Sequence, residues 1–128
     1  MTKNKAKILI VEDEPGLQKA LKAALEENNY EVTQAFNGEE AVRVIAEAKP
    51  DLILLDLILP KKNGFEVLEY LNTEKSAVPV IVLTNLESGS DIERATLLGA
   101  RAYLVKADYT LEEIVKRIAT LMEEYLPK

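Results

Sequence analysis

The stretch of sequence that decides the fold is Asp51-Leu52-Ile53-Leu54-Leu55-Asp56, an unbroken apolar run between two acidic residues. Consecutive leucine and isoleucine side chains without polar alternation are typical of a strand that is buried on both faces of a sheet. Two similar runs, Ile8–Val11 and Val80–Leu83, stand before and after it. Because strands covered on both faces occur in parallel sheets flanked by helices, the three runs predict the centre of an α/β domain.

Stretches with the spacing of amphipathic helices separate the apolar runs. Leu17, Leu21 and Leu25, for example, mark one apolar stripe. The patterns predict strands at 7–11, 32–35, 51–55, 79–83 and 101–105 and helices at 15–28, 38–48, 64–73, 90–98 and 111–124. This alternation predicts one doubly wound parallel sheet of five strands with helices on both faces.

Local signals mark the predicted helix ends. Several helix starts fit the capping box, in which one side chain caps the helix and a glutamate three residues later returns a hydrogen bond. The pairs are Asn37 with Glu40, Asn63 with Glu66, Ser90 with Glu93 and Thr110 with Glu113. Pro15 suits the first turn of a helix, and Gly99 suits a left-handed residue just after one.

Composition excludes several classes of protein. The 128 residues carry 22 acidic and 16 basic side chains, a net charge of −6, and fit a single domain over 1–128. The absence of cysteine and histidine excludes disulfides, thiolate nucleophiles, histidine-ligated zinc and a serine–histidine triad. The acidic balance argues against a nucleic-acid partner. No apolar run has the length of a signal peptide or a membrane span, so we expect a cytoplasmic protein without a membrane partner.

Polar side chains follow four of the predicted strands where each strand ends. Glu12-Asp13-Glu14 follow the first strand and Asp56 follows the third, while Thr84 and Lys106 follow the last two. In open α/β sheets this edge carries the functional crevice. Clustered carboxylates need a cation among them, and oxygen ligands without histidine or cysteine favour Mg²⁺. With Thr84 and Lys106 as donors to phosphoryl oxygens, the set predicts an acyl-phosphate site with a carboxylate nucleophile.

Each of these residues also has a plainer interpretation. The acids after the first strand could simply complement the positive end of the next helix. Thr84 could be a turn residue, and Lys106 a solvated loop charge. Asp56 fits this interpretation less well, because it caps no helix and an aspartate at the end of an apolar strand needs a partner. The joint pattern is stronger than any member, because all four strand ends share one predicted sheet edge.

The chain resembles a two-component response-regulator receiver domain of the chemotaxis-regulator type over essentially its whole length. The matching segments are Ile8-Leu9-Ile10-Val11-Glu12-Asp13-Glu14, Asp51 to Pro60 with Gly64, Val82-Leu83-Thr84-Asn85, and Gly99-Ala100 with Tyr103-Leu104-Val105-Lys106. Their order and spacing together carry the resemblance. It implies a flavodoxin-like sheet with strand order 2-1-3-4-5, counted along the chain.

The resemblance implies that the protein is a phosphoacceptor and not a turnover enzyme. Asp56 would take a phosphoryl group from a sensor histidine kinase or a phosphotransfer protein. Glu12, Asp13 and Asp56 would hold Mg²⁺, together with the backbone carbonyl of Ile58.

The resemblance also implies a switch. Thr84 and Lys106 would bind the phosphoryl oxygens, and Tyr103 would be an aromatic residue whose rotamer follows Thr84. The surface made by the last two helices and the strand between them would then be read by a downstream protein target. A lone tyrosine at such a position is otherwise a half-buried aromatic of an edge strand.

The chain departs from the family pattern at several positions. Ala107 follows Lys106 where the family usually has proline, so we expect either a trans bond or a strained cis bond there. Ile58, two residues past Asp56, offers no polar side chain to a hydrolytic water, so we expect slow loss of the phosphoryl group. Arg101-Ala102 lacks the acidic residue typical of receivers that dimerise for DNA-binding output, which favours a monomer or a weak dimer.

Other interpretations remain open at this point. A haloacid-dehalogenase-type phosphatase would need a second aspartate where Ile58 stands. A flavodoxin would need a phosphate-cradling loop where Glu12-Asp13-Glu14 stands. A receiver-like interaction module that is never phosphorylated would share the fold. The chain ends at Lys128, soon after the last helix, so we expect a stand-alone receiver or one cut from a longer protein.

Overall fold

The computed structural model describes residues 5–125. Its strands are β1 (Lys7–Val11), β2 (Glu31–Ala35), β3 (Leu52–Leu55), β4 (Val80–Thr84) and β5 (Ala102–Val105). Its helices are α1 (Pro15–Glu27), α2 (Gly38–Ala48), α3 (Gly64–Thr73), α4 (Gly89–Leu97), the short 3₁₀ helix η1 (Lys106–Asp108) and α5 (Leu111–Tyr125). The strands pair in parallel in the order β2-β1-β3-β4-β5, which confirms the predicted fold and topology. Apart from η1, which the pattern did not indicate, each boundary lies within one residue of its prediction.

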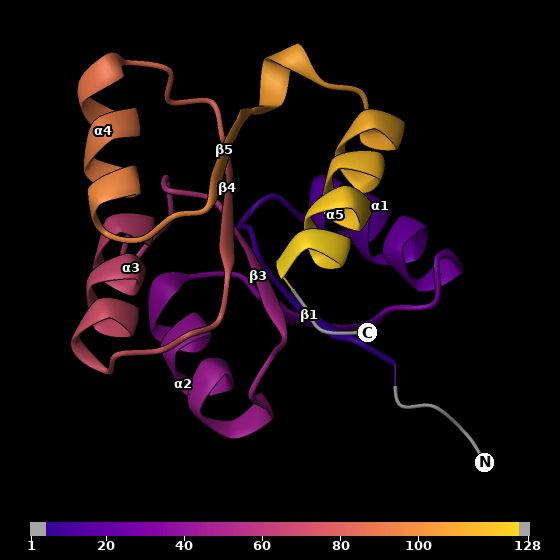
Figure 1. Cartoon of the computed structure of the whole chain (residues 1–128), viewed down its shortest axis with the longest axis horizontal. Helices are drawn as coiled ribbons and strands as arrows, with labels where there is room; N and C mark the ends of the chain where they lie inside the picture. The colour runs from indigo at the N-terminus through magenta and orange to yellow at the C-terminus, as the bar shows by residue number, and fades with distance from the viewer. Residues whose placement is uncertain (1–4, 126–128) are drawn as a thin grey trace.

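The sheet is covered by helices on both faces (Figure 1). Successive strand residues point to opposite sides, so each strand contributes to two cores. Ile53 and its alternate neighbours pack with α2, α3 and α4, whereas Leu54 and its alternate neighbours pack with α1 and α5. Both residues are at most 1% exposed, as expected for a central strand. Of the described helices, none is long and apolar enough to cross a membrane.

The predicted helix caps are mostly present. Reciprocal capping boxes form between Asn63 and Glu66 and between Thr110 and Glu113. The box predicted for α2 is half formed: Asn37 accepts a hydrogen bond from the Glu40 N–H at 2.8 Å, but the Glu40 carboxylate accepts from the Phe36 N–H. Gly99 follows α4 with a φ of 106°, as a C-terminal cap requires.

The predicted cap of α4 is wrong. Ser88, not Ser90, caps the helix, and its hydroxyl accepts a hydrogen bond from the Asp91 N–H at 3.2 Å. The two serines compete because each stands three residues before an acidic side chain.

Few contacts hold α4 against the rest of the molecule. Ala95 is its one buried residue, and Leu97 is 77% exposed, in a helix that the structure describes throughout. Arg94 lies 4.2 Å from the ring centroid of Phe65 on α3, and its Nη2 atom is 3.7 Å from Glu69 Oε1. Phe65 is buried, but the Arg94 side chain is 55% exposed, and a cation–π contact at such an exposed site contributes about 0.5–1 kcal/mol, so this attachment is weak.

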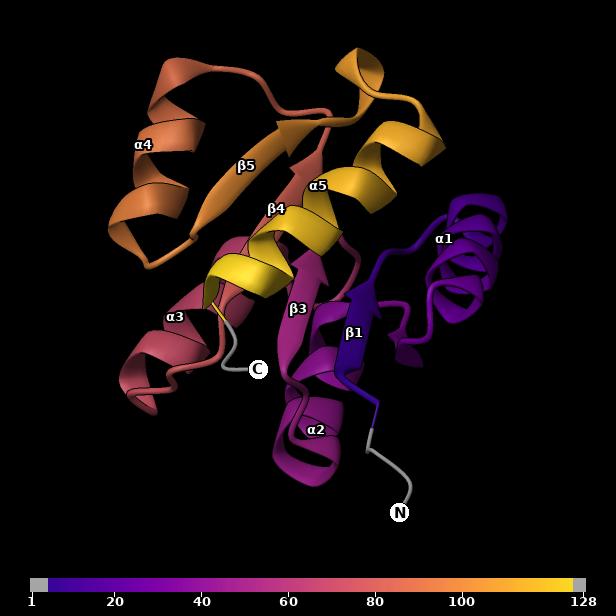
Figure 2. The same cartoon turned by 45° about the vertical axis from the view of Figure 1, so that its right-hand side comes forward.

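Because all strands run in the same direction, their carboxyl ends meet at one edge of the sheet (Figure 2). Glu12 leaves β1, Asp56 leaves β3, Thr84 ends β4 and Lys106 follows β5. The fold therefore delivers the polar residues that the sequence placed at strand ends to a single region.

Candidate functional site

Three carboxylates gather at this edge of the sheet. Glu12, Asp13 and Asp56 each offer one oxygen, and these oxygens all lie within 4.8 Å of one another. Glu12 and Asp56 are only 2% and 4% exposed, whereas Asp13 is exposed. Buried carboxylates at this distance repel one another and need a cation to remain ionised together.

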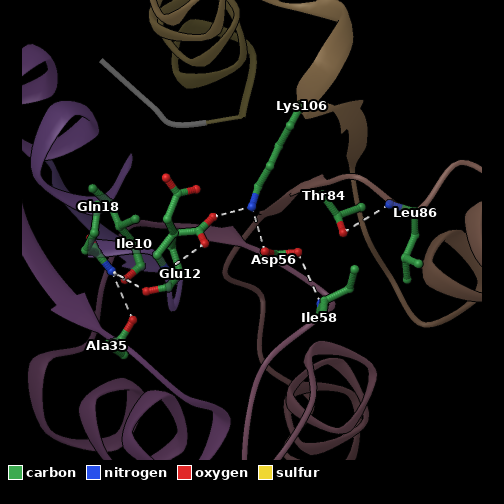
Figure 3. A network of polar contacts seen from close by, with 10 residues as sticks. Ile10, Glu12, Gln18, Ala35, Asp56, Ile58, Thr84, Leu86 and Lys106 are labelled. Carbon is green, nitrogen blue, oxygen red and sulfur yellow. Dashed lines mark hydrogen bonds and ion pairs between the residues drawn. The ribbon is translucent and has the colours of Figure 1, made fainter. Parts of the chain in front are cut away.

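Lys106 supplies a positive charge to the two buried carboxylates. Its Nζ atom lies 2.7 Å from Glu12 Oε1 and 2.8 Å from Asp56 Oδ2, and so bridges β1 and β3 from the end of β5 (Figure 3). Burial alone would lower the pKa of Lys106, but the hydrogen bonds to Asp56 and Glu12 outweigh it and raise that pKa. Lys106 is therefore an ammonium at neutral pH.

Glu12 responds differently to the same surroundings. Burial raises the pKa of Glu12, and the hydrogen bonds from Lys106 and from the Glu14 N–H offset this only in part. The nearby charge of Asp56 raises the pKa further. The ionised form of Glu12 is consequently destabilised, and a second cation in the site would stabilise it.

Backbone contacts orient Asp56. Its Oδ1 atom accepts a hydrogen bond from the Ile58 N–H at 3.1 Å, while Lys106 holds Oδ2 (Figure 3). The loop after Asp56 turns back tightly, because the Gly64 N–H donates to the Leu57 carbonyl at 3.0 Å. A Cβ atom at Gly64 would lie 2.4 Å from the Asp56 carbonyl oxygen, so only glycine fits there. The side chain of Ile58 is 53% exposed.

Thr84 and Tyr103 meet at the backbone of Leu86. The fully buried Thr84 accepts a hydrogen bond from the Leu86 N–H at 3.4 Å, and the Tyr103 hydroxyl donates to the Leu86 carbonyl at 2.7 Å. Burial, followed by the charges of Asp91 and Asp56, raises the pKa of Tyr103, so its hydroxyl remains a donor. Leu86, in the loop between β4 and α4, is thus tied to Thr84 through its N–H and to Tyr103 of β5 through its carbonyl.

Sequence reasoning missed Gln18. This residue of α1 is fully buried, and its Nε2 atom lies 3.0–3.1 Å from the carbonyl oxygens of Ile10, Glu12 and Ala35 (Figure 3). A signal was present, because Gln18 stands three residues before Leu21 on the face that packs against the sheet. A polar side chain in such a stripe indicates buried hydrogen-bonding partners.

The donor set fits a magnesium ion. Mg²⁺ prefers oxygen ligands and is commonly bound by a few carboxylates, with waters and phosphate oxygens completing its shell. Glu12, Asp13 and Asp56 present such oxygens, one of them on an exposed side chain.

The peptide bond between Lys106 and Ala107 is trans, as are all peptide bonds of the described residues.

Comparisons with known proteins agree with this geometry. Residues 8–119 match the family model described as response regulator receiver domain. The transcriptional regulatory protein CiaR of Streptococcus pneumoniae is 43% identical over 117 residues, which cover 91% of this chain and 51% of that protein. The chain spans about half the length of the curated relatives it matches.

Solved structures show the same likeness. A CheY-like response regulator receiver domain protein from Methanospirillum hungatei has a TM-score of 0.89 and 27% identity, covering 95% of this chain and 97% of its own. The phosphorylated cyanobacterial phytochrome response regulator RcpA has a TM-score of 0.81 and 31% identity, covering 96% and 95%.

Proposed function

The chain belongs to the response regulator receiver domain family, the phosphoacceptor signalling domains of two-component systems, and we propose that Asp56 is its phosphoacceptor. The observation that carries the proposal is the buried Asp56 carboxylate held between the Lys106 ammonium and the Ile58 N–H. Both of its oxygens have donors, so its orientation is fixed before a phosphoryl donor arrives.

The proposed step is a transfer from a phosphohistidine of a sensor histidine kinase or a phosphotransfer protein. A carboxylate oxygen of Asp56 forms a bond to phosphorus as the phosphorus–nitrogen bond breaks, and the imidazole takes up a proton to leave neutral. Because this chain has no histidine, the phosphohistidine must lie outside these 128 residues. Lys106 and the Thr84 hydroxyl donate hydrogen bonds to the phosphoryl oxygens.

Glu12, Asp13 and Asp56 would hold Mg²⁺, and the Ile58 carbonyl is the proposed fourth protein ligand. When bound, the ion neutralises charge that develops on the phosphoryl oxygens. Lys106 neutralises the same carboxylates from the β5 side, at 2.7 and 2.8 Å. The residues therefore place positive charge beside the nucleophile while an anionic donor approaches.

The signal would leave the site through Leu86. If the Thr84 hydroxyl turns to a phosphoryl oxygen, its hydrogen bond to the Leu86 N–H is released. The Tyr103 hydroxyl holds the carbonyl of the same residue, so the loop before α4 and the tyrosine rearrange together. We propose that the α4–β5–α5 surface carries this change to a downstream protein target, with the domain acting as a monomer or a weak dimer.

The alternatives receive less support from the residues. The position where a haloacid-dehalogenase-type phosphatase needs an acid is Ile58, whose side chain supplies no proton. Glu12, Asp56 and Lys106 form a complete ionic site, as expected of an active phosphoacceptor rather than of a silent interaction module. The net charge of −6 supports the proposal that this chain itself binds no nucleic acid.

Acetyl phosphate and Mg²⁺ test the proposal, followed by mass spectrometry of the intact protein. We expect one phosphoryl group on the wild type and none on Asp56→Asn. Asp51→Asn is the matched control, because Asp51 precedes β3 whereas Asp56 follows it, and this variant should be labelled like the wild type. Equal labelling of Asp56→Asn and wild type, or no labelling of either, would refute the assignment. Steady release of phosphate from a generic phosphomonoester would favour the phosphatase.

A further inference from the structure

Gln18 binds three backbone carbonyls with one amide group. Its Nε2 atom lies 3.1 Å from Ile10 O, 3.1 Å from Glu12 O and 3.0 Å from Ala35 O. An amide nitrogen carries two hydrogens, so at least one of them is shared between acceptors. Gln34 fixes the other end of the amide, because its Nε2 atom donates to Gln18 Oε1 at 3.3 Å. The Oε1 atom of Gln18 therefore faces the Gln34 side chain, and its Nε2 atom faces the three backbone carbonyls.

The three carbonyls belong to the backbone that carries the acidic residues of the site. Ile10 lies in β1, Ala35 ends β2, and Glu12 begins the turn to α1. The Glu12 N–H donates to the Ala35 carbonyl at 3.0 Å, and the Glu12 carbonyl accepts from Gln18. Both backbone groups of Glu12 are thus hydrogen-bonded. Asp13 is the next residue in the chain, directly after the Glu12 carbonyl that Gln18 binds.

The start of α1 lacks the side-chain N-cap that other helices of the protein have. Side chains cap α2, α3 and α4, but the residue before α1, Glu14, makes no capping hydrogen bond with its side chain. The Glu14 N–H is instead bound by Glu12 Oε2 at 3.1 Å, within the acidic turn itself. Gln18, in the first turns of the helix, instead ties α1 to β1, to β2 and to the turn between β1 and α1 by donating to their carbonyls.

We propose that Gln18 is a positioning residue of the metal site, which sets the affinity for Mg²⁺ by fixing the Glu12–Asp13 turn. The inference rests on the proposed function, since it assumes that these carboxylates bind the ion. Groups that orient metal ligands without touching the ion change metal affinity by about 10–100-fold when they are removed. Gln18 acts through the backbone of a proposed ligand and makes no contact with the ion.

Magnesium binding measured by isothermal titration calorimetry tests the inference. Gln18→Met keeps the length of the side chain and removes its donors, and we expect its Kd for Mg²⁺ to rise about tenfold. Leu25→Ala is the matched control, because Leu25 is a fully buried residue of the same helix and its truncation costs about 2–5 kcal/mol without touching the turn. Under conditions where both variants are folded, its Kd should stay near that of the wild type.

The outcomes separate the inference from the proposed function. A wild-type Kd for Gln18→Met, or an equal rise in Leu25→Ala, would overturn the role of Gln18. If the wild type itself binds no Mg²⁺, the proposed function fails instead. If Gln18→Met does not fold, Gln18→Asn replaces it: its amide is one methylene shorter and does not reach all the carbonyls. It should raise the Kd severalfold, and an unchanged Kd would again overturn the inference.

Discussion

Replacing Lys106 with methionine removes the cation that two buried carboxylates share. The Lys106 side chain is 17% exposed, and those of Glu12 and Asp56 are 3% and 4% exposed, so solvent replaces little of the lost charge. Removing one partner of a buried ion pair costs about 3–5 kcal/mol, because the other partner stays behind uncompensated. With a urea m-value of about 2 kcal/mol/M, a loss of about 4 kcal/mol lowers the unfolding midpoint by about 2 M.

The loss of stability in Lys106→Met should be smaller at acidic pH than at neutral pH. The pKa of Glu12 is already raised in the folded state, and removal of Lys106 raises it further. When the folded pKa of a carboxyl lies above its unfolded pKa, the free energy of unfolding of the protein falls as pH rises from the unfolded pKa to the folded one. Lys106→Met should therefore lie closer to the wild type at about pH 4.5 than at about pH 7.5. In the wild type Lys106 itself stays charged at both pH values, because its folded pKa is raised and the stability linked to its own titration is lost only as pH rises above its ordinary pKa.

Urea unfolding followed by circular dichroism measures both effects. Lys116→Met is the matched control, since the ion pair of Lys116 with Glu112 is 76% and 81% exposed and contributes little. Mg²⁺ at about 100 times its Kd should restore about 2.7 kcal/mol to Lys106→Met, because it supplies a new cation to the same carboxylates. Equal midpoints for Lys106→Met and the wild type at neutral pH, or a loss that is the same at both pH values, would refute the reasoning.

Other perturbations test separate parts of the structure. Gly64→Ala should lower stability by about 1–3 kcal/mol in urea unfolding, because its Cβ would lie 2.4 Å from a backbone carbonyl; Gly89→Ala, which meets open space, should not, and equal effects would contradict the close approach. Tyr103→Phe should cost about 0.5–1.5 kcal/mol and speed hydrogen exchange around Leu86; unchanged exchange would argue against the tie. Ile58→Asn should shorten the lifetime of the phosphorylated protein severalfold by mass spectrometry, and an equal lifetime would remove Ile58 from any role in hydrolysis.

The sequence was sufficient for the fold because its signals are local and agree with one another. Buried strands such as Leu52–Leu55 have no polar residue, and Asn63 with Glu66 marks the start of α3. The convergence of Glu12 and Asp56 follows from topology alone, since both leave neighbouring parallel strands at the same edge.

Other features depend on distances that no local pattern contains. Lys106 could be placed at the edge of the sheet, but its simultaneous contact with two carboxylates required the final geometry. The three acceptors of Gln18 come from two strands and a turn, so its partners could not be named from α1 alone. The cap of α4 failed for a simpler reason, because Ser88 and Ser90 satisfy the same spacing rule.

The light attachment of α4 has a consequence for whatever protein reads this domain. Moving a helix whose one buried residue is Ala95 and whose Arg94 stacks on Phe65 costs little free energy, so a partner with a small preference for another position would shift it. If phosphorylation of Asp56, as proposed, favours the displaced helix, thermodynamic reciprocity requires that a target that prefers the displaced helix also favours phosphorylated Asp56, by the same factor. The downstream target would thereby raise the equilibrium share of the phosphorylated form that it recognises.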